Sequence, residues 1–144
     1  MPVKVKKITL WRKELENRAG TLSEALEPLA QAGADLQVVM GYCYPGDRAH
    51  AAVELFPIAS KKTTNAAQSA GLSTSGIAAV HVEGDNRAGL GHSITRALAE
   101  AGVNLDFLVA HAIGRKFSAV FGFENDADAA KAVSLIKKAA ARKK

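Results

Sequence analysis

Two short segments of the chain combine residue types that can bind a small charged ligand. Residues 16–20 read Glu-Asn-Arg-Ala-Gly and residues 85–89 read Asp-Asn-Arg-Ala-Gly, and each precedes a stretch with apolar residues at helical spacing. The first amide groups of a helix lack partners within the helix and carry partial positive charge, and a nearby glycine lets a ligand approach the backbone. Each segment therefore predicts a turn that can bind a carboxylate or a phosphate.

The asparagine of each segment adds a second kind of contact. The carboxamides of Asn17 and Asn86 can donate to a ligand carboxylate and accept from a ligand ammonium group. Asp35 and Asn104 open the strand predicted after each helix. We expect them to lie close to the turn, where they could bind the ammonium group of a free amino acid. The same residue types also form ordinary turns and helix caps, so a purely structural role stays open.

The two segments begin an internal repeat. The similarity continues in constant register from Asn17 to Leu36 and from Asn86 to Leu105. Such a repeat predicts two copies of a smaller unit, here residues 1–75 and 76–144.

Hydrophobic periodicity predicts the same order of elements in both copies. The predicted strands are residues 8–15, 36–42, 51–56 and 72–75 in the first copy, and 77–83, 105–113 and 116–123 in the second. The predicted helices are 21–32, 60–70, 90–101 and 126–138. Thr21 and Glu24 have the spacing of a capping box, and Pro28 predicts a kink within the first helix.

This order predicts an α+β fold made of two ferredoxin-like βαββα(β) repeats. Each repeat would be an antiparallel sheet with its helices on one face. The fourth strand is short in the first copy and missing in the second, which would leave unpaired backbone at a sheet edge. We therefore expect sheet edges to pair, within the chain or across a dimer.

Composition excludes several classes of protein. The 144 residues are 48% hydrophobic and 23% charged, with no apolar run of the roughly 20 residues that a membrane span needs. No signal peptide is readable, and the single cysteine, Cys43, cannot form an internal disulfide, so we expect a cytoplasmic protein. The net charge of +5 comes from lysines and arginines crowded at the two ends, which does not predict a nucleic-acid surface. The four histidines lack metal-binding spacing, and no motif predicts a cofactor.

The two segments, together with the helix ends that follow them, resemble the motif of the ACT domain family. In that family an acidic residue precedes Asn-Arg-Pro-Gly-x-Leu, and the helix that follows ends in Gly-x-Asn-Ile. Residues 85–89 with residues 102–105 (Gly-Val-Asn-Leu) resemble this motif well. Residues 16–20 with residues 33–36 (Gly-Ala-Asp-Leu) resemble it slightly less. The resemblance covers most of the chain as two tandem ACT repeats, although the motifs are short.

The resemblance implies a regulatory module that binds an amino acid. In serine-responsive members, the asparagine of the turn and the one opening the second strand hold the ligand at an interface between two domains. The implied ligand-binding residues are Asn17, Ala19, Gly20 and Asp35 in the first copy, and Asn86, Ala88, Gly89 and Asn104 in the second. Ala19 and Ala88 replace the family's proline, and Asp35 replaces its asparagine. These departures leave open which amino acid binds and whether both copies bind.

We therefore expect a non-catalytic, amino-acid-sensing protein that binds its ligand at interfaces between repeats or subunits. We further expect a homodimer that regulates a partner enzyme. Two alternatives remain open. One is a small acylphosphatase-like hydrolase on the same fold, with Arg18 or Arg87 binding phosphate. The other is an oligomerisation module without a ligand.

Overall fold

The computed structural model describes residues 3–141, which fold into two compact units. The first unit comprises residues 9–76. The second unit comprises residues from 77 onward together with the N-terminal segment up to Ile8. Arg142, Lys143 and Lys144, which belong to the basic C-terminus noted in the sequence, lie outside the described residues.

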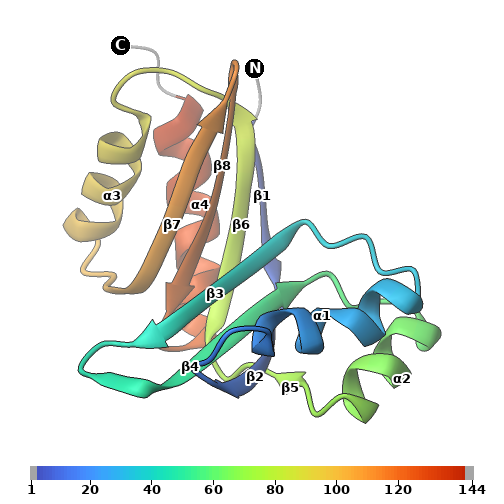
Figure 1. The fold of residues 1–144 in the computed structure, drawn as a ribbon. Helices are drawn as coiled ribbons and strands as arrows, with labels where there is room; N and C mark the ends of the chain where they lie inside the picture. Colours follow the sequence, from blue (N-terminus) through green and yellow to red (C-terminus); the bar gives the residue numbers. More distant parts are fainter. Residues whose placement is uncertain (1–2, 142–144) are drawn as a thin grey trace. The chain divides into compact units, whose positions relative to one another are not determined.

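The first unit is a four-stranded antiparallel sheet covered by two helices (Figure 1). Its elements are β2 (Trp11–Glu16), α1 (Thr21–Gln31), β3 (Val38–Tyr44), β4 (Asp47–Phe56), α2 (Lys61–Ser69) and β5 (Ser73–Thr74). The strands lie in the order β3-β4-β2-β5. Leu29 of α1 and Ala67 of α2 pack in one core with Trp11 and Leu55 of the sheet, so both helices cover the same face.

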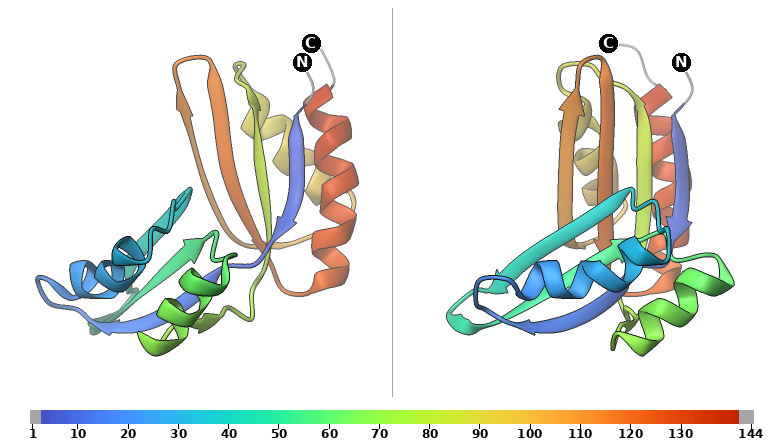
Figure 2. Two further views of the ribbon diagram at one scale, coloured as in Figure 1. Left: turned by 90° about the vertical axis from the view of Figure 1, so that its right-hand side faces the viewer. Right: turned by 45° about the vertical axis from the view of Figure 1, so that its right-hand side comes forward.

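The second unit repeats this plan. Its elements are β1 (Lys4–Ile8), β6 (Ala78–Asp85), α3 (Leu90–Glu100), β7 (Leu105–Ile113), β8 (Lys116–Phe123) and α4 (Asp126–Ala141). The strands lie in the order β1-β6-β8-β7, and α3 and α4 lie on one side of the sheet (Figure 2). Ile94 and Ile136 from the helices are fully buried against Val80 and Phe121. The predicted α+β class with ferredoxin-like units and helices on one face is confirmed.

The strand predicted over residues 8–15 is confirmed from Trp11 onward, but Ile8 ends a separate strand that was not predicted. Lys4 to Ile8 pair with β6 of the second unit, whereas Trp11 to Glu16 pair with β4 of the first. Strand-forming residues run through the break, so the pattern does not show where the chain changes sheets. β1 takes the place of the fourth strand that the second copy lacks. The units consequently differ from the ranges 1–75 and 76–144 in the N-terminal segment up to Ile8 and at Gly76.

The predicted capping box at the start of α1 is also wrong. Gly20 occupies the N-cap position with a φ of 94°, and no side chain caps the helix. The Thr21 hydroxyl instead donates to the carbonyls of Glu16 (2.9 Å) and Arg18 (3.1 Å). Glu24 pairs with the Arg18 guanidinium, so its carboxylate is directed into the turn. Pro28 lies inside α1, as the sequence predicts.

Among the described residues, no helix is both long and apolar enough to cross a membrane.

Candidate functional site

The turn between β2 and α1 is fixed to the β3–β4 hairpin through Asn17. Its backbone N–H donates to the carbonyl of Ala49 (3.0 Å), and its side-chain Nδ2 donates to the carbonyl of Arg48 (2.6 Å). Gly20 then takes a positive φ that favours glycine and starts the helix. Within residues 3–141, the described side-chain hydrogen bond of Asn17 uses only Nδ2, so its carboxamide oxygen could accept from a ligand.

An open cleft lies beside this turn. It has a volume of about 620 Å³ and is lined by Glu14, Leu15, Glu16, Asn17, Arg18, Ala49 and His50. The lining brings carboxylates, a guanidinium and an amide to one surface. These groups match the two charges of a free amino acid, because a guanidinium binds carboxylate and a carboxylate binds ammonium.

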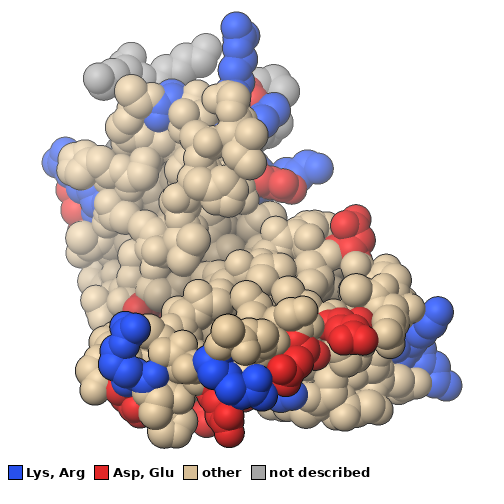
Figure 3. All heavy atoms as spheres, in the orientation of Figure 1, with Lys and Arg blue, Asp and Glu red and all other residues tan. Residues whose placement is uncertain are grey.

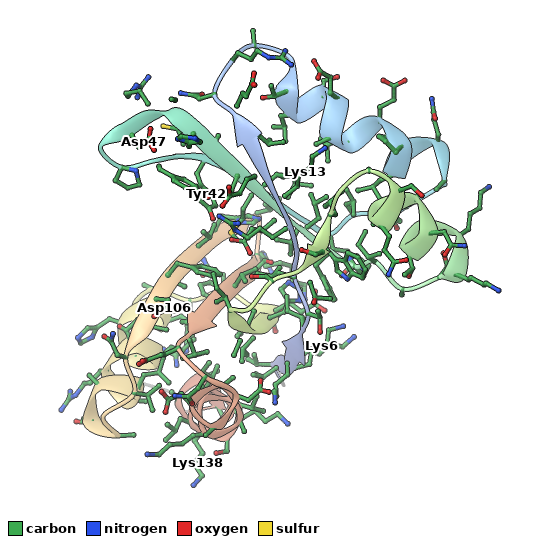
Figure 4. All side chains as sticks on the ribbon, turned by 90° about the horizontal axis from the view of Figure 1, so that it is seen from below. Lys6, Lys13, Tyr42, Asp47, Asp106 and Lys138 are labelled. Atoms are coloured by element: carbon green, nitrogen blue, oxygen red, sulfur yellow. The ribbon has the colours of Figure 1, made fainter. Side chains whose placement is uncertain are left out.

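Ion pairs hold the charged groups of the cleft. The Arg18 guanidinium lies 3.2 Å from carboxylate oxygens of both Glu24 and Glu16, and these hydrogen bonds raise the pKa of Arg18. His50 donates through Nδ1 to Asp47 (2.7 Å), and this hydrogen bond lowers the pKa of the Asp47 carboxyl. Figure 4 shows Asp47 at the tip of the β3–β4 hairpin. Since all these groups are exposed, each can exchange its partner for a ligand at small cost.

A second polar cluster joins the strands beside the cleft. Glu54 of β4 is 1% exposed and accepts a hydrogen bond from the Tyr42 hydroxyl (2.8 Å). Arg12 of β2 lies 3.9 Å from the same carboxylate oxygen. Burial and the neighbouring Glu54 raise the pKa of Tyr42, which projects from β3 (Figure 4). This cluster ties three strands together and thereby supports the strand ends that carry Glu14 and His50.

The equivalent turn of the second unit is built differently. Asn86 again binds the neighbouring hairpin, through its backbone N–H and the carbonyl of Arg115 (2.8 Å). Lys116 pairs with Asp85 (2.7 Å) and lowers the pKa of that carboxyl. Arg87 donates to the carbonyl of Ala139 in α4 (3.2 Å), away from the turn. Gly89, like Gly20, has a positive φ (82°) and precedes the helix.

Ala19, Ala88 and the asparagine side chains of both turns are exposed, as ligand contacts must be. Asp35 and Asn104 are exposed too, but the expectation that they lie close to the turn of their own unit is wrong. Glu16 pairs with His50, whereas Val38, just after Asp35, pairs with Phe56 at the other end of β4. The two ends are about 20 Å apart at about 3.3 Å per residue.

The same separation occurs in the second unit. Asp85 pairs with Lys116 at one end of β8, and Leu105, which follows Asn104, pairs with Phe123 at the other. The reason is that strands before and after a crossover helix run parallel, so the turn and the second strand's start lie at opposite ends. Within a single unit, the asparagine of the turn and the residue that opens the following strand therefore do not meet at one site.

His50, Glu14 and Ala49 are cleft residues that the sequence patterns did not single out. Ala49 and His50 reach the turn only through the pairing of β4 with β2. Extending the predicted 51–56 strand back to the Pro45-Gly46 turn would have placed them opposite Glu16. Among the described residues, no group of three or more histidine, cysteine, aspartate or glutamate side chains could hold a metal ion.

The sequence matches no family model and no curated protein. Solved structures, in contrast, match almost the whole chain. Protein BT0572 from Bacteroides thetaiotaomicron is 17% identical with a TM-score of 0.72, over 90% of this chain and 88% of that one. The ligand-free regulatory subunit of aspartate kinase from Thermus thermophilus is 14% identical with a TM-score of 0.63, over 96% and 97%. The regulatory subunit of aspartate kinase from Thermus flavus is 17% identical with a TM-score of 0.58, again over 96% and 97%. At these identities the matches show the fold, which is that of tandem ACT domains.

Proposed function

We propose that this protein is a non-catalytic regulatory module that binds a small amino acid in the cleft beside Asn17. The observation that carries the proposal is the lining of that cleft, where Arg18, Asn17 and two glutamates meet at one turn. The fold supports this proposal, because it is shared with two proteins described as regulatory subunits of aspartate kinase.

The charges of the cleft indicate how the ligand would lie. Its carboxylate would bind the Arg18 guanidinium and the free amide ends of the turn, and its ammonium group would bind Glu14 or Glu16. Arg18 is now shared between Glu16 and Glu24. Exposed ion pairs of this kind contribute about 0–1 kcal/mol each, so a ligand carboxylate can replace one of them.

Regulation would require that ligand occupancy favours one state of the protein over another. We propose that ligand binding regulates a separate enzyme that this module contacts, by analogy with the matched structures, which are regulatory subunits of a kinase.

For the hydrolase alternative, an arginine would have to be presented to phosphate. Arg87 instead donates to the carbonyl of Ala139, which does not favour that role.

The test is a thermal-shift screen with each standard amino acid. A ligand at about 100 times its Kd stabilises by about 2.7 kcal/mol, which shifts Tm by several degrees in a protein of this size. We expect Arg18→Gln to weaken binding of the hit by roughly 10- to 150-fold, since one charged hydrogen bond contributes about 1.5–3 kcal/mol.

Arg48→Gln is the matched control. Arg48 is an exposed arginine on the neighbouring hairpin, and its side chain contacts Cys43 rather than the cleft. Its replacement should leave affinity unchanged. A screen in which no amino acid shifts Tm, or a hit that Arg18→Gln binds as tightly as the wild type does, would overturn the proposal.

A further inference from the structure

Glu54 is a buried carboxylate that the sheet of the first unit leaves partly unpaired. Its side chain is 1% exposed, and among the described residues its Oε1 has no hydrogen-bond partner. Its Oε2 accepts from the Tyr42 hydroxyl (2.8 Å), and the Nε of Arg12 lies 3.9 Å from the same oxygen. A buried carboxylate is costly unless its oxygens are hydrogen-bonded, so the open Oε1 requires an explanation.

Arg12 is placed opposite Glu54, but its donors are turned to other groups. The two residues are partners in the ladder between β2 and β4. The Nη1 of Arg12 lies 3.4 Å from Oε1 of Glu14, and Nη2 donates to the Tyr44 hydroxyl. That hydroxyl donates in turn to the same oxygen of Glu14 (3.1 Å), and the guanidinium carbon lies 5.9 Å from the centre of the Tyr44 ring. Arg12 is therefore shared between a buried and an exposed carboxylate.

The exposed carboxylate, Glu14, is one of the groups that line the cleft beside Asn17. Its side chain is 64% exposed, against 28% for Arg12. An exposed carboxylate loses little when it exchanges one cation for another, whereas water screens a buried ion pair much less. In Figure 3, basic and acidic side chains lie next to one another over the first unit, so exchange of partners is open to its exposed charges.

We propose that Arg12 is a switch between these two carboxylates, and that occupancy of the cleft moves it. When a ligand ammonium group binds Glu14, it displaces the guanidinium, which then turns to Glu54 and donates to both of its oxygens. A guanidinium matches a carboxylate in this two-bond geometry, and the open Oε1 provides the second acceptor. That a ligand takes Glu14 rests on the proposed function, whereas the competition of two carboxylates for one guanidinium does not.

The switch links the cleft to the middle of the sheet. A close pair of Arg12 with Glu54 joins β2 to β4, and Glu54 already accepts from Tyr42 of β3. A ligand at Glu14 therefore tightens the contacts among three strands at a place that it does not touch. Regulation by a ligand requires such a difference in contacts between two states of the protein.

Replacing Glu14 tests the switch without any ligand. Glu14→Gln removes the competing carboxylate, as a bound ammonium group does. In NMR spectra of the isotope-labelled chain, the Nε–H signal of Arg12 is assigned from its loss in Arg12→Lys. We expect this proton to exchange with water at least about tenfold more slowly in Glu14→Gln than in the wild type, because Nε then donates to a buried carboxylate.

Stability gives a second measure of the same competition. In the wild type, Glu54→Gln leaves the guanidinium to Glu14, whereas in the Glu14→Gln background it removes the remaining carboxylate partner that Arg12 has in the structure. We therefore expect Glu54→Gln to raise the unfolding equilibrium constant at least about tenfold more in the Glu14→Gln background, as measured by urea denaturation.

Glu16→Gln is the matched control. Glu16 lies on the same strand and lines the same cleft, but it pairs with Arg18. Its replacement should leave the Arg12 signal and the effect of Glu54→Gln unchanged. Wild-type exchange of the Arg12 proton in Glu14→Gln, an equal cost of Glu54→Gln in both backgrounds, or the same changes in Glu16→Gln would overturn the switch. A thermal-shift screen without a hit would instead overturn the proposed function and would leave the competition for Arg12 in place.

Discussion

Gly122 of β8 lies directly opposite Phe107 of β7, and the phenyl ring covers it. A Cβ at position 122 would overlap this ring, since even the third-nearest ring carbon would be only 2.8 Å away. We therefore expect Gly122→Ala to displace the ring and to lower the free energy of unfolding by about 1–3 kcal/mol, the usual range for an overpacked site. Urea denaturation followed by circular dichroism measures this change.

Gly91 provides the control for this substitution. It lies inside α3, and a Cβ there would meet nothing within 4 Å. Gly91→Ala should be neutral or stabilise by up to about 1 kcal/mol, because alanine favours helix. In a Phe107→Ala background the cost of Gly122→Ala should largely disappear. An unchanged cost in that background would show that the ring is not its cause.

His81 makes stability depend on pH. It is 4% exposed on β6, and burial lowers the pKa of its imidazole, with Glu83 opposing the shift and Lys6 adding to it. The folded protein thus binds this proton less readily than the unfolded chain, whose histidines titrate near pH 6.5. The stability contributed by neutral His81 is therefore present above about pH 6.5 and is lost as the pH falls below that value.

We accordingly expect Tm to fall between about pH 7.5 and about pH 5.5, and to fall less in His81→Gln. The neutral replacement removes the difference in proton binding between the folded and unfolded states, whatever it costs at neutral pH. Differential scanning calorimetry at both pH values gives the two slopes. His92→Gln, at an exposed position of α3, should keep the wild-type slope. A His81→Gln variant with the wild-type slope would contradict this assignment.

Residue types and local spacing were enough to identify one half of the candidate site. The Asn-x-x-Gly turns form where the sequence predicts them, with Gly20 and Gly89 at positive φ. The cleft around Asn17 also needs His50, which strand register brings to the turn. Register is a property of the folded sheet, so local patterns could not supply it. The misplacement of Asp35 has the same origin.

Among the helices and strands, β1 shows most directly how the chain is divided into two units. Val5 is 8% exposed and packs in the core of the second unit, although it precedes the whole first unit in sequence. We expect Val5→Asp to bury a charge and to destabilise the second unit by about 2–4 kcal/mol. Amide hydrogen exchange should show lost protection in β6 and α4, while β4 keeps its protection.

Lys4→Gln is the control, because Lys4 is exposed on the same strand. It should leave exchange unchanged in both units. Equal loss of protection in β4 and β6 after Val5→Asp would mean that β1 stabilises both units rather than the second alone.

Most helices and strands were predictable because their periodicity is strong. The predicted bounds of β7 and β8 agree with the structure, and the two predicted helices of each repeat form. What failed was information that is not local. Nothing in the sequence between Ile8 and Trp11 marks a change of sheet. The capping box predicted at Thr21 does not form, because the turn places Gly20, in a left-handed conformation, at the N-cap position.

At the scale of the whole molecule, the two units have separate hydrophobic cores. The core of the first unit contains Trp11, the chain's single tryptophan, together with Leu29. The core of the second contains Ile136, and the two clusters share no residue. Tryptophan fluorescence therefore reports on the first unit alone, whereas far-UV circular dichroism reports on both.

This separation predicts that the two units can be destabilised one at a time. Leu29→Ala should cost about 2–5 kcal/mol and lower the fluorescence midpoint by about 10 °C or more. Ile136→Ala should cost a similar amount, since both side chains are fully buried, but should shift only part of the circular dichroism transition and leave the fluorescence midpoint in place. Fluorescence and circular dichroism melts of the wild type and the two variants decide the matter. If both probes shift together in both variants, the chain unfolds as one cooperative body, and ligand binding in the first-unit cleft would then stabilise the second unit equally.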